Sequence, residues 1–460
     1  MFDNILGQDE AVAALKADIE GDCLPPAILL SGPPASGKAT AALELARVLS
    51  CSYASRGEGS SAPSIRAPWN CACPACSRHR LLVHPDLLLF GPRSFPEEIS
   101  AGLELLARSP GPAAAYFFVR AARKLAKRFD PVLYQGEESR LAKAGSLLRE
   151  LEECLDAVAP GKASAGAAAQ GAMDAAGKAA AVAAKLEALV PDAPPVFMIR
   201  NAETWARLAP HGPRKVAIIE NADRMQESSR NALLKILEEP PESVRFVLTT
   251  SRRSAIMTTI LSRARTYRFA QRDQEGSARV VERIFRSSEP AASVEAFLSA
   301  RAPFPPARAR ELAEAFLGAA LSSGGEGLPR PLSALAREFG RSEAARSGAR
   351  DGAPSAALAM LLEATKDFGQ KDPAMASSFT AFLAALAAAL GSLLREEGMD
   401  ASAVGLVERI AALVRAASNE YETMNRGPGL LAEALLYAIG DAAAVAAAAP
   451  PDALARGAAS

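Results

Sequence analysis

The chain has 460 residues, a length that suggests about three domains. Hydrophobic residues make up 49% and charged residues 23%, which excludes a wholly disordered chain. The 52 basic and 52 acidic residues cancel, which argues against a strongly basic nucleic-acid binder as a description of the whole chain. The apolar run at 380–394 is too short for a membrane span, and the N-terminus does not resemble a secretory leader. We therefore expect a cytoplasmic protein without a membrane segment, whose cysteines bind metal or are buried rather than form disulfides.

The first 92 residues alternate between helical and strand patterns. Apolar residues recur at helical spacing within 8–20, and an apolar strand pattern at 27–30 leads into a loop rich in glycine and proline. Another helix is predicted at 39–50. A strand, a glycine loop and a helix in this order form one unit of a parallel α/β sheet.

Residues 32–38 read Gly-Pro-Pro-Ala-Ser-Gly-Lys, which fits the phosphate-binding loop pattern G-x-x-x-x-G-K. Gly32 and Gly37 would let backbone N–H groups point at phosphates, and Lys38 would neutralise the β and γ oxygens. The alternative is a glycine turn before a helix, but the position directly after an apolar strand favours the phosphate loop. The sequence thus predicts a site for ATP or ADP.

The residue after the loop lysine is normally Ser or Thr, whose hydroxyl binds Mg²⁺. Here that residue is Ala39. Thr40 comes one position later, which on a helix turns its side chain about 100° away. We therefore expect a loop that can bind phosphates but lacks its metal ligand.

Residues 93–195 depart from the α/β pattern and are interpreted as an insertion. Residues 113–158 have the apolar spacing of two amphipathic helices. Residues 160–184 are a low-complexity Ala/Gly/Lys stretch, which we expect to be mobile or loosely helical.

The α/β pattern resumes at residue 196. The predicted elements are a strand at 215–220, a helix at 228–239, a strand at 244–249, a short helix at 256–261 and a strand at 266–269. Pro240 stops the longer helix because proline cannot continue it. After residue 270 only helical patterns remain.

An active ATPase with this loop needs an aspartate at a strand end for Mg²⁺, and often an adjacent glutamate that activates water. Glu220 stands at the first of these positions and Asn221 at the second, where an amide cannot accept a proton from water. Asp223 is an alternative acid, two residues further into the turn. Departures in two motifs argue against hydrolysis by this chain.

Four cysteines could supply thiolates to one structural zinc ion, with no coordination position left open for water. They are Cys51, Cys71, Cys73 and Cys76. The alternative is a group of incidental thiols in a turn. Cys23 and Cys154 have no partner pattern and are expected to be buried small residues.

Several segments resemble bacterial DNA polymerase III clamp-loader subunits, the delta-prime type in particular, with the gamma/tau type as the alternative. The segments are Phe-Asp-Asn-Ile-Leu-Gly-Gln at 2–8, His-Pro-Asp at 84–86, Glu-Asn-Ala-Asp-Arg-Met at 220–225, Asn-Ala-Leu-Leu-Lys-Ile-Leu-Glu-Glu-Pro-Pro at 231–241 and Ile-Leu-Ser-Arg at 260–263. The resemblance covers 1–92 and 196–270, and the tail at 421–439 more weakly. The insertion at 93–195 departs from it.

The resemblance implies an AAA+ domain over 1–270, built on a P-loop parallel sheet with a zinc module at 51–90. It implies a small helical lid over 271–325 and an all-α collar for oligomerisation over 326–460. The family's module has the spacing C-x-x-C-x-x-C, from which Cys71 departs because it lies one residue too close to Cys73.

The resemblance also implies a partnership with gamma/tau and delta subunits in a five-membered ring that loads the sliding clamp onto primed DNA. A delta-prime-type subunit is a stator that hydrolyses little ATP itself. Its Ser-Arg motif, here Ser262 and Arg263, supplies an arginine finger to ATP in a neighbouring subunit. A guanidinium suits this role because it is planar and always charged.

Other interpretations remain beside the stator. Arg263 could be an ordinary exposed arginine. The chain could be a gamma-like motor that uses Lys38 and Glu220, or a scaffold that binds no nucleotide. Ala39 and Asn221 argue against the motor, whereas the intact glycines and lysine of the loop argue against the scaffold.

Overall fold

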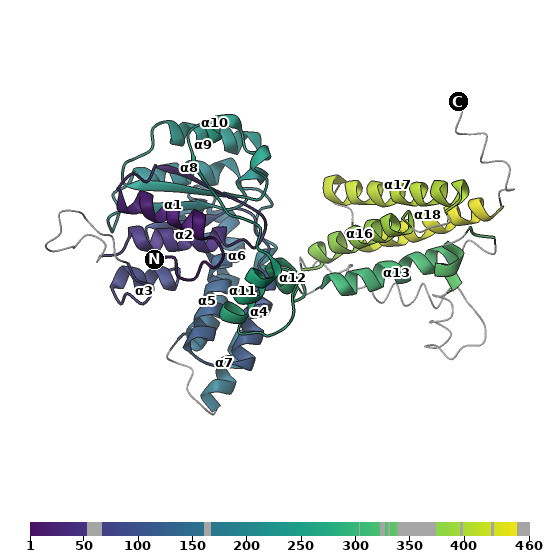
Figure 1. Cartoon of the computed structure of the whole chain (residues 1–460), viewed down its shortest axis with the longest axis horizontal. Helices are drawn as coiled ribbons and strands as arrows, with labels where there is room; N and C mark the ends of the chain where they lie inside the picture. Colours follow the sequence, from purple (N-terminus) through teal and green to yellow (C-terminus); the bar gives the residue numbers. More distant parts are fainter. Residues whose placement is uncertain are drawn as a thin grey trace. The chain divides into compact units, whose positions relative to one another are not determined.

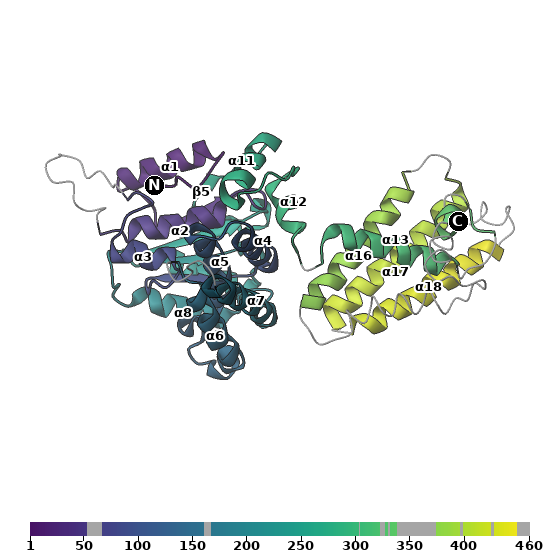
Figure 2. The same cartoon turned by 90° about the horizontal axis from the view of Figure 1, so that it is seen from below.

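The computed structural model describes residues 1–52, 67–160, 167–302, 304–322, 327–329, 332–337, 374–395, 399–424 and 427–448. The chain divides into two compact units, Met1–Ala302 and Pro303–Ser460 (Figures 1 and 2). The first unit contains a parallel sheet with helices on both faces, and the described part of the second is helical.

The first unit is built on a parallel sheet in the order β2-β3-β4-β1-β5. Its strands are β1 (Ala27–Ser31), β2 (Leu87–Phe90), β3 (Lys215–Ile219), β4 (Val244–Thr250) and β5 (Arg265–Arg268). The order β3-β4-β1 places the ends of β1 and β3 on either side of β4, and with them the phosphate loop and Glu220. The predicted strands are confirmed, whereas β2 was not singled out from the sequence.

The helices of the first unit cover both faces of this sheet. They are α1 (Asp9–Glu20), α2 (Lys38–Leu49), α3 (Pro74–Arg80), α4 (Pro96–Arg108), α5 (Pro112–Ala126), α6 (Glu138–Val158), α7 (Ala167–Glu187), α8 (Val196–Arg207), α9 (Glu227–Glu238), α10 (Thr258–Leu261), α11 (Gln274–Phe285) and α12 (Val294–Ser299). Short 3₁₀ turns follow α5, namely η1 (Lys127–Phe129) and η2 (Pro131–Tyr134). Two more, η3 (Ala222–Arg224) and η4 (Arg253–Ala255), follow β3 and β4.

Successive buried apolar residues of β1 to β4 belong to different cores, because side chains alternate across a strand. Ile28 and Leu30 of β1 pack in the core that includes α1 and α2. Ala27 and Leu29 pack in the core that includes α4 to α9. The continuous apolar strands predicted from the sequence are therefore explained by burial on both faces.

The insertion is an integral part of the second of these cores. Phe118 of α5, Leu151 of α6 and Leu186 of α7 are fully buried together with Leu88 and Phe90 of β2. The low-complexity stretch was expected to be mobile or loosely helical, but it contributes most of α7, a 21-residue helix whose buried alanines pack against α6. The expected helix is therefore present from Ala167, and it is packed rather than loose, because small residues allow two helices to pack closely. Residues 161–166 of the stretch lie outside the described residues.

The described part of the second unit consists mainly of α13 (Pro306–Ser322), α16 (Ala374–Leu393), α17 (Ala401–Met424) and α18 (Pro428–Ala448). Its core joins Phe316 of α13 and Phe382 of α16 to Ile410 of α17 and Ile439 of α18. The lid was predicted over 271–325, but α13 packs in this bundle, and the first compact unit ends at Ala302. The assignment of a lid and a collar stays a prediction.

Helix α18 is long and apolar enough to cross a membrane by length and composition, contrary to the expectation that the chain has no such segment. Leu431, Leu435 and Ile439 of this helix are buried in the bundle. A core helix of this kind passes the same test, so α18 is weak evidence for a membrane span.

Candidate functional site

The phosphate loop connects β1 to α2, as predicted. A Cβ atom on Gly32 would lie 2.3 Å from the carbonyl oxygen of Phe269, so only glycine fits there. Gly37 has φ of +101°, in the left-handed region that glycine adopts at little cost. The two glycines of the pattern are therefore explained by close packing and by backbone conformation.

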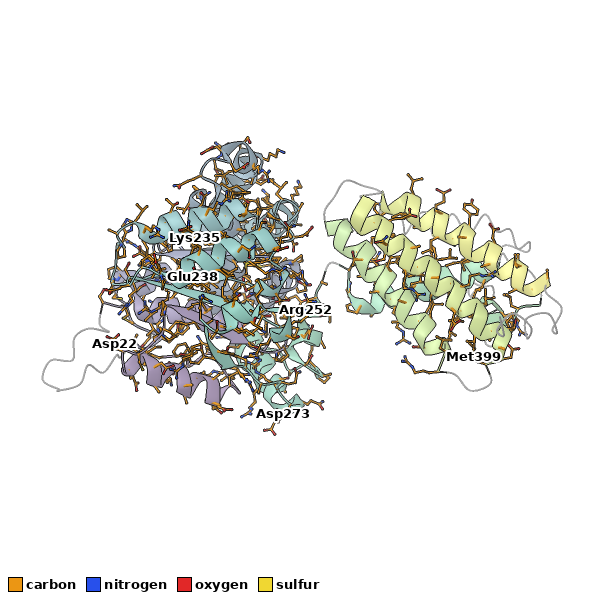
Figure 3. The ribbon with its side chains drawn as sticks, turned by 90° about the horizontal axis from the view of Figure 1, so that it is seen from above. Asp22, Lys235, Glu238, Arg252, Asp273 and Met399 are labelled. Carbon is orange, nitrogen blue, oxygen red and sulfur yellow. The ribbon has the colours of Figure 1, made fainter. Side chains whose placement is uncertain are left out.

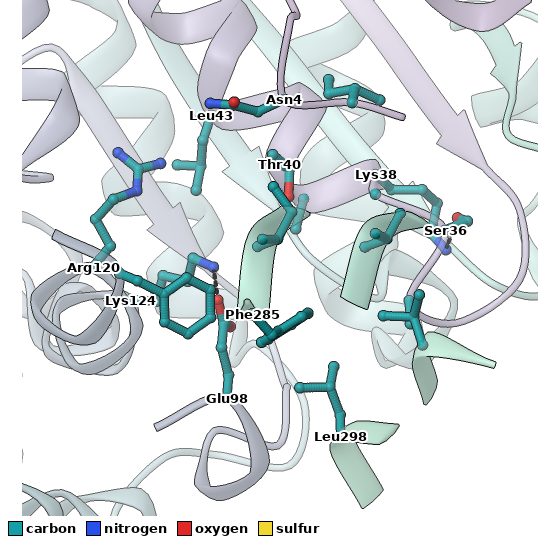
Figure 4. Close-up of a pocket in the computed structure, with 18 of the residues that line it drawn as sticks. Asn4, Ser36, Lys38, Thr40, Leu43, Glu98, Arg120, Lys124, Phe285 and Leu298 are labelled. Atoms are coloured by element: carbon teal, nitrogen blue, oxygen red, sulfur yellow. Dashed lines mark hydrogen bonds and ion pairs between the residues drawn. The ribbon is translucent and has the colours of Figure 1, made fainter. Parts of the chain in front are cut away.

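Lys38 is turned back onto this loop. Its Nζ donates hydrogen bonds to the carbonyl oxygens of Gly32 (2.6 Å) and Pro33 (2.5 Å), and to Ser36 Oγ (3.3 Å) (Figure 4). Burial lowers the pKa of Lys38 to about 8. The ammonium group is therefore held at the loop by oxygen atoms that a phosphate could replace.

A cavity of about 920 Å³ opens in front of the loop. Ala39 and Thr40 line it together with residues of the N-terminal segment, α4, α5, α11 and α12. Phe285 and Leu298 contribute apolar surface on the side of α11 and α12 (Figure 4). Both its size and its mixed lining are typical of a cofactor site.

Glu220 lies at the cavity, directly after β3, as the motif predicted. Arg93 Nη1 donates to its Oε1 (2.9 Å), and Arg128 Nη2 donates to its Oε2. Only 4% of the residue is exposed. Burial alone would raise the pKa of Glu220, but the two guanidinium groups outweigh it and lower the pKa to about 2. Both oxygens of the expected metal ligand are thus occupied by arginines.

Asn221, at the position of the catalytic glutamate, and Asp223, the alternative acid, are also engaged. Asn221 donates from Nδ2 to the carbonyl oxygen of Pro92 (2.7 Å). Asp223 accepts from Thr250 Oγ1 (2.8 Å) and from Arg252 Nε (3.0 Å). Each side chain therefore has a hydrogen-bond partner within the protein, and neither is free to accept a proton from water.

The insertion supplies a second charged group to this site. Glu98 of α4 pairs with Lys124 of α5 and with Arg93 Nη2 (2.6 Å). Arg93 thereby joins Glu98 to Glu220, while Arg128 of η1 binds Glu220 from the other side. None of these four charged residues was predicted from the sequence. Arg128, for example, is separated from Glu220 by 92 residues, and no local pattern connects them.

Ser262 and Arg263 lie at the end of α10 and are exposed. Arg263 Nη2 donates to Glu238 Oε1 (2.9 Å), and its Nη1 donates to the carbonyl oxygen of Thr259 (2.9 Å). Figure 3 labels Glu238 on α9, together with Lys235 of the same helix. The predicted finger is therefore a surface guanidinium held by one exposed carboxylate.

The four predicted cysteines meet at one buried point. Their sulfur atoms lie within 4.8 Å of one another, with Cys51 Sγ at 3.7 Å from Cys71 Sγ and 4.0 Å from Cys73 Sγ. A tetrahedral zinc site with Zn–S of about 2.3 Å places its sulfurs about 3.8 Å apart. The spacing therefore suits a tetrahedral metal site, and the tight Cys71–Cys73 interval does not prevent it.

A buried arginine supports this cysteine cluster. Arg47 Nη1 donates to Cys76 Sγ (3.0 Å), and Arg47 also pairs with Glu44. Burial raises the pKa of the Cys76 thiol, and the charge of Arg47 opposes that rise. The two remaining cysteines were expected to be buried, but Cys23 is exposed and Cys154 is half-buried, so that expectation was wrong.

The His-Pro-Asp segment has a structural role. Asp86 is fully buried and accepts hydrogen bonds from the backbone N–H groups of His211 (3.0 Å) and Gly212 (2.7 Å). The ring of His84 accepts from the N–H of Asp86 (3.1 Å). These contacts connect the start of β2 to the turn before β3.

Residues 198–273 match the family model described as "DNA polymerase III, delta subunit". The chain is 40% identical over 73 residues to DNA polymerase III subunit tau of Escherichia coli (strain K12), covering 16% of this chain and 11% of that protein. It is 33% identical over 73 residues to subunit delta' of Haemophilus influenzae, covering 16% and 22%. A segment of this chain is therefore similar to DNA polymerase III subunits of the delta, tau and delta' types.

The similarity is limited in extent. The matches span about a tenth to a fifth of the length of these two relatives. A crystal structure of a gamma-subunit-related protein from Thermotoga maritima is 16% identical, covering 54% of this chain and 79% of that one, with a TM-score of 0.24. Because both tau and delta' occur among the relatives, the matches do not separate the two types of subunit.

Proposed function

We propose that the chain is a delta-prime-like stator of a DNA polymerase III clamp loader. Its AAA+ domain takes part in a ring with gamma/tau- and delta-type subunits, which loads the sliding clamp onto primed DNA in the cytoplasm. The ring contains five subunits, and the bundle of α13, α16, α17 and α18 serves as the collar that joins them.

The observation that carries this proposal is that the acidic side chains beside the phosphate loop are bound by other side chains of the chain. Glu220 is paired with two arginines, and Asp223 is bonded to Thr250 and Arg252. Ala39 offers no hydroxyl for Mg²⁺. A site without a metal ligand or a general base is poorly suited to phosphoryl transfer, which relies on both.

The stator contributes Arg263 instead. Arg263 is exposed, and the one carboxylate that holds it, Glu238, is itself exposed. An exposed ion pair of this kind contributes about 0–1 kcal/mol, so a γ-phosphate of a neighbouring subunit can compete for the guanidinium. Ser262 stabilises the turn by donating to the carbonyl oxygen of Thr259 (3.0 Å).

The four clustered cysteines hold a structural Zn²⁺ in this proposal. Their sulfur spacing and burial suit the closed tetrahedral geometry, and the zinc connects the end of α2 to α3. A closed site leaves no position for a reacting water, so the metal supports the fold only.

The alternative is a gamma/tau-like motor, which the match to tau and the intact loop favour. ATP hydrolysis by the purified full chain separates the two. A stator gives no hydrolysis that the Lys38→Ala variant removes. Hydrolysis in the wild type that Lys38→Ala abolishes would establish the motor and overturn the stator.

A further inference from the structure

The site in front of the phosphate loop carries a surplus of positive charge. Lys38, Arg93 and Arg128 bring three positive charges, against the single negative charge of Glu220. Glu98 and Lys124 form a further pair and cancel. These six residues therefore have a net charge of +2, the same as that of an ordinary site with one lysine, one divalent cation and one aspartate. Other charged side chains, among them Arg272 and Glu295, also line the cavity.

The acid at the end of β3, Glu220, is unavailable to a divalent cation. Mg²⁺ demands near-octahedral oxygen ligands, which in a nucleotide site are one or two protein oxygens together with phosphate oxygens. Here Glu220 would first have to lose Arg128, which would leave a buried guanidinium without its carboxylate, or Arg93, which would keep only Glu98. Breaking a buried ion pair in this way is strongly unfavourable.

The cationic groups that face the cavity are instead suited to phosphate. Lys38, Arg93 and Arg272 line it, and Arg272 Nη1 also donates to the carbonyl oxygen of Ala35 in the loop (2.8 Å). Guanidinium groups bind phosphate oxygens with two parallel hydrogen bonds. The cavity, at about 920 Å³, is large enough for a triphosphate chain and a base.

We propose that this cavity binds a triphosphate chain in its metal-free form, with Arg93 in the place of the divalent cation. The inference rests on the predicted phosphate-binding role of the loop, and it assigns a role to the insertion. The insertion supplies Arg93 and Arg128 together with the Glu98–Lys124 pair that holds Arg93 in place.

The decisive measurement is the effect of Mg²⁺ on binding to the full chain. Isothermal titration with ATP and, separately, with inorganic tripolyphosphate is carried out in EDTA and in excess Mg²⁺. A conventional site binds more tightly with Mg²⁺. Here Mg²⁺ and the protein compete for the same phosphate oxygens, so we expect Mg²⁺ to weaken binding by about tenfold or more.

The two ligands distinguish the source of the phosphate chain. Tighter binding of ATP identifies a nucleoside triphosphate, whereas equal binding identifies the inorganic chain, and either result supports the proposal if Mg²⁺ weakens binding. Tighter binding in Mg²⁺, or no binding of either ligand in EDTA, overturns it. Neither of these failures touches the proposed stator role, which depends on Arg263 acting on a neighbouring site.

Variants separate the phosphate contacts from general charge. Lys38→Ala and Arg93→Gln should each weaken metal-free binding by about tenfold or more. Arg207→Gln is the matched control, because Arg207 is an exposed arginine of the same unit that pairs with Glu203. Circular dichroism and the thermal midpoint establish that each variant is folded. Folded Lys38→Ala and Arg93→Gln chains that bind as tightly as the Arg207→Gln control would contradict the proposal.

Discussion

Glu187, the last residue of α7, has an unusual environment for a carboxyl group. Its Oε1 accepts a hydrogen bond from the backbone N–H of Phe95 (3.1 Å), two residues from Arg93. Burial raises the pKa of Glu187 from 4.5 to about 7, against the opposing effect of that hydrogen bond. The folded chain therefore keeps a proton over a pH range in which the unfolded chain has lost it.

This difference predicts a pH dependence of stability. Where the folded state binds the extra proton, stability is fully present below about pH 4.5 and is lost as the pH rises through about 7. Glu187→Gln keeps an acceptor for Phe95 and removes the titration. We expect this variant to exceed the wild type by about 1–3 kcal/mol at pH 8 and to match it near pH 4.

Denaturant unfolding of wild type and variant at both pH values measures the effect. Glu150→Gln, at an exposed position of α6, controls for loss of a negative charge. A Glu187→Gln advantage that is the same at both pH values, or that Glu150→Gln reproduces, would contradict the assignment.

The main residues of the site could be predicted from the sequence, but their ion-pair partners could not. Gly32, Gly37, Lys38 and Glu220 were found from a local pattern, because a phosphate loop and a strand end are short-range features. Arg93 and Arg128 were not, because their relation to Glu220 depends on how the insertion packs on β2 and β3. A buried ion pair between distant segments leaves no spacing in the sequence.

At the scale of elements, the cysteine cluster connects the end of α2 to α3. We expect about one zinc ion for each purified full chain, since four thiolates complete one tetrahedral site. Cys76→Ser should lose the metal and lower the thermal midpoint, because the metal stabilises only the folded state. The Cys154→Ser variant, which is changed outside the cluster, should keep the metal and the wild-type thermal midpoint. Metal analysis that finds no zinc under reducing conditions would contradict the proposal.

The prediction of elements succeeded where the pattern was periodic. The strands β1, β3 and β4 were predicted because continuous apolar runs follow from burial on both faces of a parallel sheet. The strand β5 was also predicted, although only its Tyr267 is buried. β2 is also a buried apolar run, but it has only four residues and lies next to the insertion in the sequence, and it was not predicted. α7 was underestimated because its repetitive composition conceals the buried positions at Ala176, Ala179 and Val182.

At the scale of the whole molecule, α18 presents an exposed apolar face. Leu430, Tyr437 and Val445 are 73%, 55% and 60% exposed, and their spacings of seven and eight residues place them along one side of the helix. The opposite side is buried in the bundle. In the proposed collar, this face contacts a neighbouring subunit.

Tyr437→Asp should therefore impair assembly with gamma/tau- and delta-type subunits in size-exclusion chromatography, because a buried unpaired charge is costly at an interface. The thermal midpoint of the isolated chain should be unchanged, since Tyr437 is exposed. Ala412→Asp adds the same charge at an exposed position of α17 and serves as the control. Normal assembly of the Tyr437→Asp chain would contradict the proposal that α18 lies in the interface.

The proposed action on a neighbouring ATP site is tested most directly by Arg263→Ala in the reconstituted loader. An arginine finger contributes about 10³–10⁵-fold to kcat at the site it serves. We therefore expect ATP hydrolysis at that site to be nearly abolished while the loader still assembles. Arg207→Ala is matched as an exposed arginine paired with a glutamate and should leave the rate unchanged. The account predicts a lower ATP hydrolysis rate for Arg263→Ala alone, and an unchanged rate in a fully assembled loader would contradict it.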